Sequence, residues 1–148
     1  MNIKNKIISE THTSISCYKQ GLFWTSYEQS AYQIWKKKKY KVSCKYVKKI
    51  KQTITSVNFP ETALDELLKQ FEIEGCLIHR MNDYVRVQVK EQISFRDFKD
   101  WKVRVVNTLD IKEQIMSFSL STKTPIDAFE FIQNLQTDLQ ANLIIPNY

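Results

Sequence analysis

The sequence predicts the mixed α+β class, with a small mixed sheet flanked by helices and a C-terminal helical tail. Two observations indicate this fold. Strand-like alternation and helix-like spacing interleave over the first two thirds of the chain, and only helical patterns follow. The length of 148 residues and the 43% hydrophobic content suit a single packed core. We therefore expect an α/β domain over residues 1–106 and a helical extension over residues 107–148 that packs on it.

The N-terminal quarter of the chain predicts a helix, a strand and a second helix. Residues Ile3–Ser9 suit a short helix, and Ser14–Gln20 alternate as a strand does. Gly21 then turns the chain. A helix is expected over Trp24–Lys39, because apolar residues recur on one helical face, at Tyr27, Ala31, Ile34 and Trp35.

The middle of the chain contains strand signals around one clear helix. Val42–Ile50 leaves a strand and a short helix both open, because lysines interrupt either pattern. Thr53–Val57 is β-branched and predicts a buried strand, which ends at Phe59-Pro60. The helix that follows has an apolar stripe at Leu64, Leu67, Leu68 and Phe71. Two further strands are expected at Ile73–Arg80 and Tyr84–Val89.

The last third of the chain predicts helices. One is expected at Phe95–Val105, where the VRVV segment leaves a strand open, and another at Leu109–Phe118. Thr124 and Pro125 predict the start of a third, because threonine can accept a hydrogen bond from a free amide and proline suits the first helical position. This helix is expected to end near Asn142 and to bury Ala128, Ile132, Leu135 and Leu139.

Several classes of protein are not indicated by the sequence. His12 and His79 lie far apart and outside metal-ligand spacing, and two glycines cannot form a glycine-rich phosphate loop. We therefore expect a non-enzyme without catalytic residues, metal or cofactor. No apolar run approaches about 18 residues, which predicts no membrane segment. The polar N-terminus predicts no secretion signal, and three widely spaced cysteines suit a reducing cytoplasm. A cytoplasmic protein is expected.

Charge is distributed unevenly along the chain. Residues 1–60 contain twelve lysines against Glu10 and Glu28, whereas residues 61–148 contain ten basic and fourteen acidic side chains. These parts carry +10 and −4, which sum to the net charge of +6. Nine lysines and no acid lie within residues 36–51. Such a run is either a solvated surface or a site for an anionic partner, and we favour a polyphosphate partner.

Two adjacent aromatic residues, Phe23 and Trp24, follow the glycine turn. Both rings could pack in the core, or one of them could be presented to a partner. Trp24 is in helical phase with Tyr27 and Ala31 and can join the buried stripe, whereas Phe23 precedes the expected helix. We therefore expect Trp24 to anchor the turn and Phe23 to be presented.

The lysine run and its aromatic neighbours predict a nucleic-acid-binding surface. Lysine contacts phosphate without selecting a base, and this region contains no arginine that could recognise guanine. Aromatic side chains in the run can stack on unpaired bases, although Trp35 is expected in the core. The predicted contact residues are Phe23, Lys36, Lys37, Lys38, Lys39, Tyr40, Lys41, Lys45, Tyr46, Lys48, Lys49 and Lys51.

Two blocks of sequence resemble the N-terminal mismatch-recognition domain of the MutS family. They are Gly21-Leu22-Phe23-Trp24-Thr25 with Tyr27-Glu28 and Ala31, and Val57-Asn-Phe-Pro60-Glu-Thr-Ala63-Leu64 with Leu67-Leu68. Their order and separation agree with that family over residues 14–80. The resemblance implies a small mixed sheet flanked by helices. It also implies that Phe23 matches the ring that wedges into the duplex, whereas Thr25 replaces the glutamate that contacts the mispaired base.

The chain is also similar to short, stand-alone MutS-like proteins encoded beside reverse transcriptases of bacterial diversity-generating retroelements. The similarity rests on the aromatic turn, on VNFP at residues 57–60, and on Ser117-Phe118, Thr124-Pro125, Phe131 and Leu135-Gln136. It implies a non-catalytic accessory factor in a ribonucleoprotein. Such a factor would bind structured template RNA or cDNA, and its acidic C-terminal half would dock on the reverse transcriptase to support error-prone reverse transcription.

Two other functions stay open. A DNA mismatch- or distortion-binding protein would use Phe23 as an aromatic wedge where base stacking is weak. A protein-interaction module without nucleic-acid binding would bury both Phe23 and Trp24 and would use the lysines for solubility alone.

Overall fold

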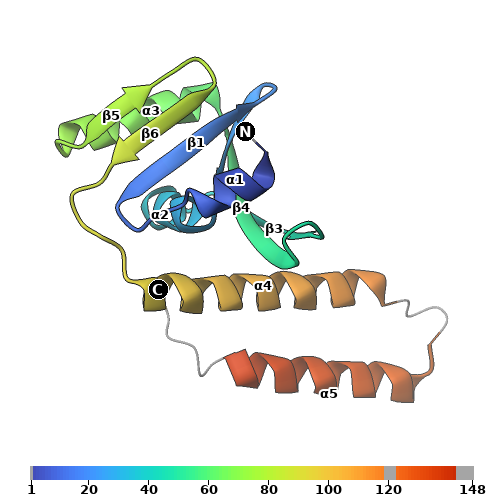
Figure 1. Cartoon of the computed structure of the whole chain (residues 1–148). Helices are drawn as coiled ribbons and strands as arrows, with labels where there is room; N and C mark the ends of the chain where they lie inside the picture. Colours follow the sequence, from blue (N-terminus) through green and yellow to red (C-terminus); the bar gives the residue numbers. More distant parts are fainter. Residues whose placement is uncertain (1, 119–122, 143–148) are drawn as a thin grey trace.

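The computed structural model describes residues 2–118 and 123–142, so the end of the expected extension, 143–148, lies outside the described residues. Figure 1 shows a sheet with helices on both sides and two long helices beneath it. The helices are α1 (Ile3–Ile8), α2 (Glu28–Lys38), α3 (Glu61–Ile73), α4 (Phe95–Ser117) and α5 (Pro125–Asn142). The strands are β1 (Ser14–Gln20), β2 (Phe23–Tyr27), β3 (Val42–Val47), β4 (Gln52–Pro60), β5 (Leu77–Arg80) and β6 (Tyr84–Gln88).

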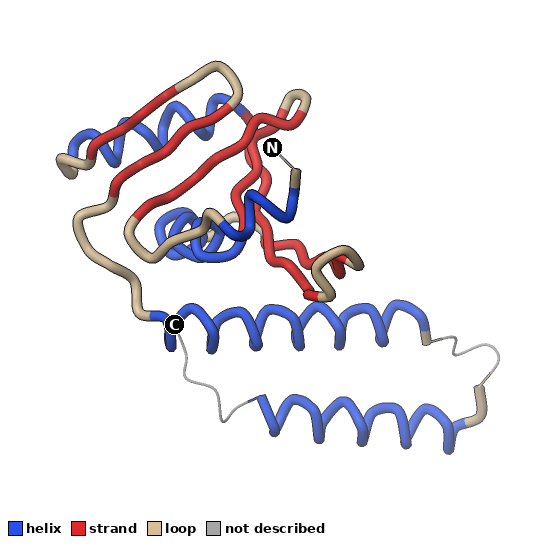
Figure 2. The backbone as a smooth tube through the Cα atoms, in the orientation of Figure 1, coloured by secondary structure: helices blue, strands red, loops and turns tan. Residues whose placement is uncertain are grey.

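The described strands form one sheet in the order β3-β4-β2-β1-β6-β5, which Figure 2 shows in red. This arrangement confirms the mixed α+β class, and each of these strand pairs is antiparallel. The central hairpin turns at Gly21, whose φ of +63° is a conformation that favours glycine. Its register pairs Gln20 with Phe23 and Lys19 with Trp24.

One face of the sheet packs against α2, α3 and α4. Trp24, Val57 and Phe59 point to this side and are at most 1% exposed. The predicted apolar stripe of α3 packs on them, and all four of its residues, Leu64, Leu67, Leu68 and Phe71, are buried. Burial of each large apolar side chain contributes roughly 1.5–3 kcal/mol, so this layer holds the fold together.

The opposite face, which we call the open face, is more polar. Among the described elements only α1, six residues long, lies over it (Figure 1). A small cluster of Tyr18, Tyr27 and Ile54 is buried between the strands and α1, where Ile3 and Ile7 pack on it. Because α1 covers only part of this face, the region of β2, β3 and β4 beside it is accessible.

The prediction that a helix begins at Trp24 is wrong. Phe23–Tyr27 form strand β2, and α2 begins at Glu28. Trp24 packs in the core on the helical side, whereas Tyr27 packs on the open face, as strand alternation requires. Pairing with both β1 and β4 satisfies the backbone of β2 on each side, and this outweighs the helical spacing of its side chains. Trp24 nevertheless anchors the turn, as expected.

Other expected boundaries also change. The ambiguous Val42–Ile50 segment contains strand β3, and α3 continues to Ile73, so that the next strand begins only at Leu77. The two helices expected between residues 95 and 118 are one helix, α4, on which Trp101 and Val105 pack against the main core. The domain junction expected between residues 106 and 107 therefore falls within a continuous helix.

The expected burial of α5 is only partly observed. The side chains of Ala128 and Leu135 are half-buried, but Ile132 and Leu139 are 53% and 51% exposed. The reason is that α5 packs mainly against α4 among the described elements, through contacts such as the stacked rings of Phe118 and Phe131, whose centroids lie 4.2 Å apart. Within residues 2–118 and 123–142, no helix combines the length and the apolar composition needed to cross a membrane.

Candidate nucleic-acid interface

A cationic groove crosses the open face between α1 and the β3–β4 hairpin. Its volume is about 630 Å³. Three hairpin lysines, Lys45, Lys48 and Lys49, line it together with Lys6 of α1. The other lining residues are Ile3, Gln20, Thr25, Tyr27, Tyr46, Val47, Ile54, Ser56 and Asn58, and none of these described residues is acidic. We call this site the open-sheet groove.

Polar side chains that are tied to one another form the floor of the open-sheet groove. Gln20 donates a hydrogen bond from Nε2 to the hydroxyl of Tyr27, at 2.6 Å, and Thr25 donates from Oγ1 to Oδ1 of Asn58. Burial raises the pKa of Tyr27, so its hydroxyl stays protonated at neutral pH. The floor therefore offers fixed, uncharged donors and acceptors between the lysines, which suits a ligand that has both phosphates and polar base edges.

Phe23 lies at one end of the same face. It opens β2, pairs with Pro60, and is on the side of the strand that also carries Thr25. Its side chain is 51% exposed, whereas that of Trp24 is 1% exposed. The exposure of Phe23 is therefore compatible with its expected presentation to a partner, and the ring lies on the sheet face that contains the lysine-lined groove.

The structure divides the predicted lysine surface. Lys36 and Lys37, on α2, lie at the opposite side of the sheet, in a hollow that also contains Glu91 and Asp97. Lys37 forms an ion pair with Glu74, the residue that follows α3. Acidic neighbours thus offset part of the charge of the α2 lysines, whereas the described lining of the open-sheet groove contains no acid.

The remaining predicted residues lie between or beyond these two sites. Lys39, Tyr40 and Lys41 line a second groove, between the end of α2 and α4. Tyr40 is half-buried and stacks on Phe59 with ring centroids 5.7 Å apart, so one of its faces is already covered by the core. Lys38 is half-buried in the last turn of α2, and Lys51 is exposed in the β3–β4 turn.

Neither acid of the first 60 residues offsets the surface lysines. Glu28 is buried, and its carboxylate accepts from Lys102 Nζ at 2.7 Å and from the backbone amide of Thr55 at 2.8 Å. Burial raises the pKa of Glu10 to about 8, so this carboxyl is mostly protonated at neutral pH. The surface charge of the N-terminal part is therefore more positive than its composition suggests.

Sequence reasoning missed part of the open-sheet groove. Lys6, Gln20, Thr25 and Asn58 belong to it, yet none was a predicted contact residue. A signal existed for Asn58, because alternation along β4 places it on the face opposite Val57 and Phe59. Lys6 gave no such signal, since only the tertiary packing of α1 brings it to the groove.

Histidine and cysteine side chains are scattered. Within the described part of the chain, no three or more His, Cys, Asp or Glu side chains gather as a metal site would require. His12 contacts the ring of Phe95 edge-on, with centroids 5.4 Å apart. Burial raises the pKa of the Cys17 thiol to about 12, so this thiol stays protonated.

Comparisons of the chain with protein-family models, with curated proteins and with solved structures found no match. The resemblance to the MutS mismatch-recognition domain and to retroelement accessory proteins therefore stays a prediction.

Proposed function

We propose that this protein is a non-catalytic nucleic-acid-binding factor whose open-sheet groove holds a sugar–phosphate backbone. The observation that carries this proposal is the groove itself, in which four lysines surround a neutral polar floor without an acid among the described lining residues. Lys45, Lys48 and Lys49 contact phosphates, and Lys6 contacts them from the opposite wall. Lysine supplies charge without base selection, so the binding is weakly dependent on sequence.

The groove favours an unpaired strand over a regular duplex. Its floor contains Tyr27, Gln20 and Asn58, which a base can reach only when it is not hidden in a stack. Phe23 is 51% exposed on the open face and offers a ring on which a base can stack. Tyr46 is 57% exposed but pairs with Thr53, so strand alternation directs its ring to the opposite side of the sheet from Lys45. Single-stranded RNA, the loops of structured RNA and cDNA all fit this chemistry.

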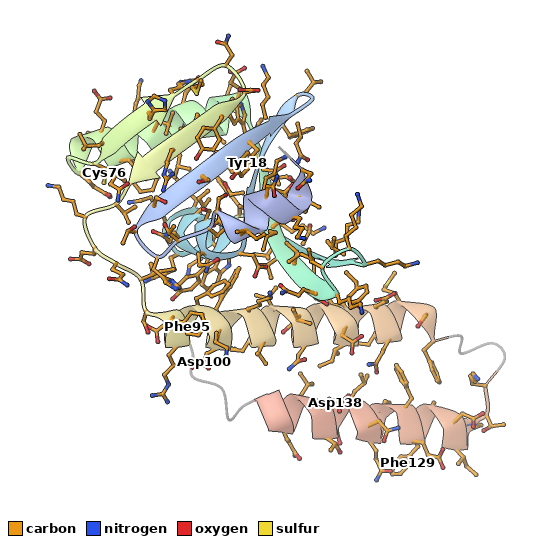
Figure 3. The ribbon with its side chains drawn as sticks, viewed as in Figure 1. Tyr18, Cys76, Phe95, Asp100, Phe129 and Asp138 are labelled. Atoms are coloured by element: carbon orange, nitrogen blue, oxygen red, sulfur yellow. The ribbon has the colours of Figure 1, made fainter. Side chains whose placement is uncertain are left out.

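The resemblance to retroelement proteins adds a narrower proposal. The nucleic acid is structured template RNA or nascent cDNA, and the partner is a reverse transcriptase in the cytoplasm. Helix α5 supports a docking role, since it carries Asp127, Glu130 and Asp138 but no basic residue. It also exposes Ile126 and Phe129 by 70% and 63%, and Figure 3 shows Phe129 on the side of α5 that faces away from α4. A basic partner with an apolar patch suits this surface.

A salt titration tests the nucleic-acid part of the proposal. Fluorescence anisotropy with a labelled single-stranded RNA should give an affinity that falls with salt, with a slope of about −3 in a plot of log K against log salt, because four lysines displace counterions. A slope near zero, or no binding at about 50 mM salt, would contradict it. Copurification with a reverse transcriptase tests the narrower proposal separately, and loss of this interaction on Phe129→Asp would support docking through α5.

A second candidate, a sensor of distorted DNA, is favoured by one observation. Leu22 and Phe23 lie at the tip of the central hairpin and are 88% and 51% exposed. Either the leucine side chain or the phenylalanine ring could therefore insert between two weakly stacked base pairs. Comparing affinity for matched and mismatched duplexes separates the two candidates. A preference of about tenfold or more for the mismatched duplex that is lost in Phe23→Ala would favour the sensor.

A further inference from the structure

The second groove has the composition of a nucleotide-binding site. It lies between the end of α2, the start of β3 and one side of α4, and its volume is about 520 Å³. Ligand pockets for small molecules of nucleotide size commonly span about 300–1,000 Å³. Lining residues on α4 recur at helical spacing, which makes this wall continuous: Trp101, Arg104, Val105, Thr108, Leu109 and Lys112. We call this site the helical groove.

Positive charge surrounds the helical groove. Lys39 and Lys41 line it from the α2–β3 side, and Arg104 and Lys112 line it from α4, so cations lie on both walls. None of the described lining residues is acidic. Basic side chains that converge from two elements can contact several oxygens of one polyphosphate. Lysines scattered over a solvated surface are too far apart to do so.

Aromatic rings complete the helical groove. Trp35, Tyr40 and Trp101 line it, and the Trp35 and Trp101 centroids lie 5.7 Å apart. Lys39 is in the left-handed conformation, with φ of +56°, and its ammonium lies 3.7 Å from the centroid of the Trp35 ring. A base that replaced this lysine on the indole would leave the ammonium free to contact phosphate.

We infer that the helical groove binds one unpaired nucleotide, with its base against the aromatic wall and its phosphates among Lys39, Lys41, Arg104 and Lys112. The nucleotide has two possible sources, a free nucleoside triphosphate or a residue of a single strand, and the recognised chemistry is the same in both. This inference does not depend on the open-sheet groove, from which it uses no residue.

Isothermal titration calorimetry of the full chain with ATP tests the inference. We expect saturable binding of one ATP at about 50 mM salt, and binding at least about tenfold weaker for adenosine and for inorganic triphosphate, because base and phosphates both contribute. Equal binding of triphosphate and ATP would show a simple polyanion site and would overturn the role of the rings. Absence of binding by both ATP and an oligothymidylate would overturn the inference entirely.

Matched variants on α4 locate the site. Arg104→Gln with Lys112→Gln should weaken ATP or oligonucleotide binding about tenfold or more, while Arg96→Gln with Lys99→Gln, which removes the same charge outside the groove, should change it less than about twofold. Should the first variant lose its helical circular dichroism, Lys41→Gln with Lys112→Gln replaces it, because both of these side chains are exposed. Equal weakening by the groove and control variants would contradict the location.

A competition experiment identifies the source of the nucleotide. In it, an oligothymidylate competes with ATP for binding to the triple variant Lys45→Gln, Lys48→Gln, Lys49→Gln. These changes remove hairpin charge from the open-sheet groove and leave the helical groove intact. An oligothymidylate that displaces ATP there identifies a single strand as an occupant, and ATP binding without displacement identifies the free nucleotide. Either outcome supports the site.

Discussion

The two faces of the sheet differ in what covers them, and this difference indicates where a ligand can bind. The helical side is closed by α2, α3 and α4 over apolar residues such as Trp24 and Phe59. The open face carries the short α1 over part of its surface, and beside it lie tyrosine, amide and lysine side chains. The same strands supply both faces, because side chains alternate along each strand.

The comparison teaches that lysine number alone does not define the interface. Most of the lysine run belongs either to α2, on the helical side, or to the β3–β4 hairpin, at the open face. Lys37 is paired with Glu74, whereas the hairpin lysines border a groove whose described lining contains no acid. A polyanion gains most where protein charge is not already offset.

The largest expected effect concerns stability and comes from neighbouring positions on β4. Phe59→Ala removes a ring that is 1% exposed and should lower the free energy of unfolding by about 3–5 kcal/mol. Asn58→Ala, one residue earlier and on the open face, should cost less than about 1 kcal/mol but weaken RNA binding. Urea denaturation measures the first quantity and anisotropy the second. Similar stability losses in both variants would contradict the assignment of the two faces.

The protonation of Glu10 in the folded protein can be tested through the pH dependence of stability. Its pKa is raised from 4.5 to about 8, so the folded state holds a proton that the unfolded chain releases near pH 4.5. This stabilisation is complete below pH 4.5 and is lost as the pH rises through about 8. The free energy of unfolding should therefore fall from pH 5 to pH 8 by at least about 1 kcal/mol more in the wild type than in Glu10→Gln. Parallel pH profiles of the two proteins would show that Glu10 is ionised.

Phe23→Ala has the smallest expected effect. The ring is 51% exposed, so its removal should change the free energy of unfolding by less than about 0.5–1 kcal/mol. Loss of one stacked base should weaken single-stranded RNA binding by about three- to tenfold. Trp24→Ala is the matched change at the buried neighbour and should mainly destabilise the fold. Unchanged RNA binding by Phe23→Ala would leave the ring without a role in the open-sheet groove.

Much of the fold could be predicted from local patterns. The apolar stripe of α3 and the capping signal before α5 are properties of short segments, and both were located correctly. The start of α2 was not, because Trp24 and Tyr27 fit a helical spacing and a strand alternation equally well. Pairing of β2 with both β1 and β4 decides between them, and the pairing with β4 joins parts of the chain that are distant in sequence.

The candidate site was predicted less completely, for the same reason. Lysines that are adjacent in sequence suggested one surface, but the turn after α2 sends Lys36 and Lys45 to different sides of the sheet. Lys6 reaches the open-sheet groove through the packing of Ile3 and Ile7 on the tyrosine cluster. Such convergence depends on tertiary contacts, which neither charge density nor periodicity contains.

Two triple variants with the same charge change test the central claim most directly. Anisotropy with single-stranded RNA at about 100 mM salt should show binding at least about 30-fold weaker for Lys45→Gln, Lys48→Gln, Lys49→Gln, with a salt slope reduced by about 2. The matched variant Lys36→Gln, Lys37→Gln, Lys38→Gln should lose less than about fivefold, because all three lysines belong to α2 on the helical side and acids lie near Lys36 and Lys37. Equal losses in the two variants, or a larger loss for the α2 variant, would contradict the assignment of phosphate binding to the open face.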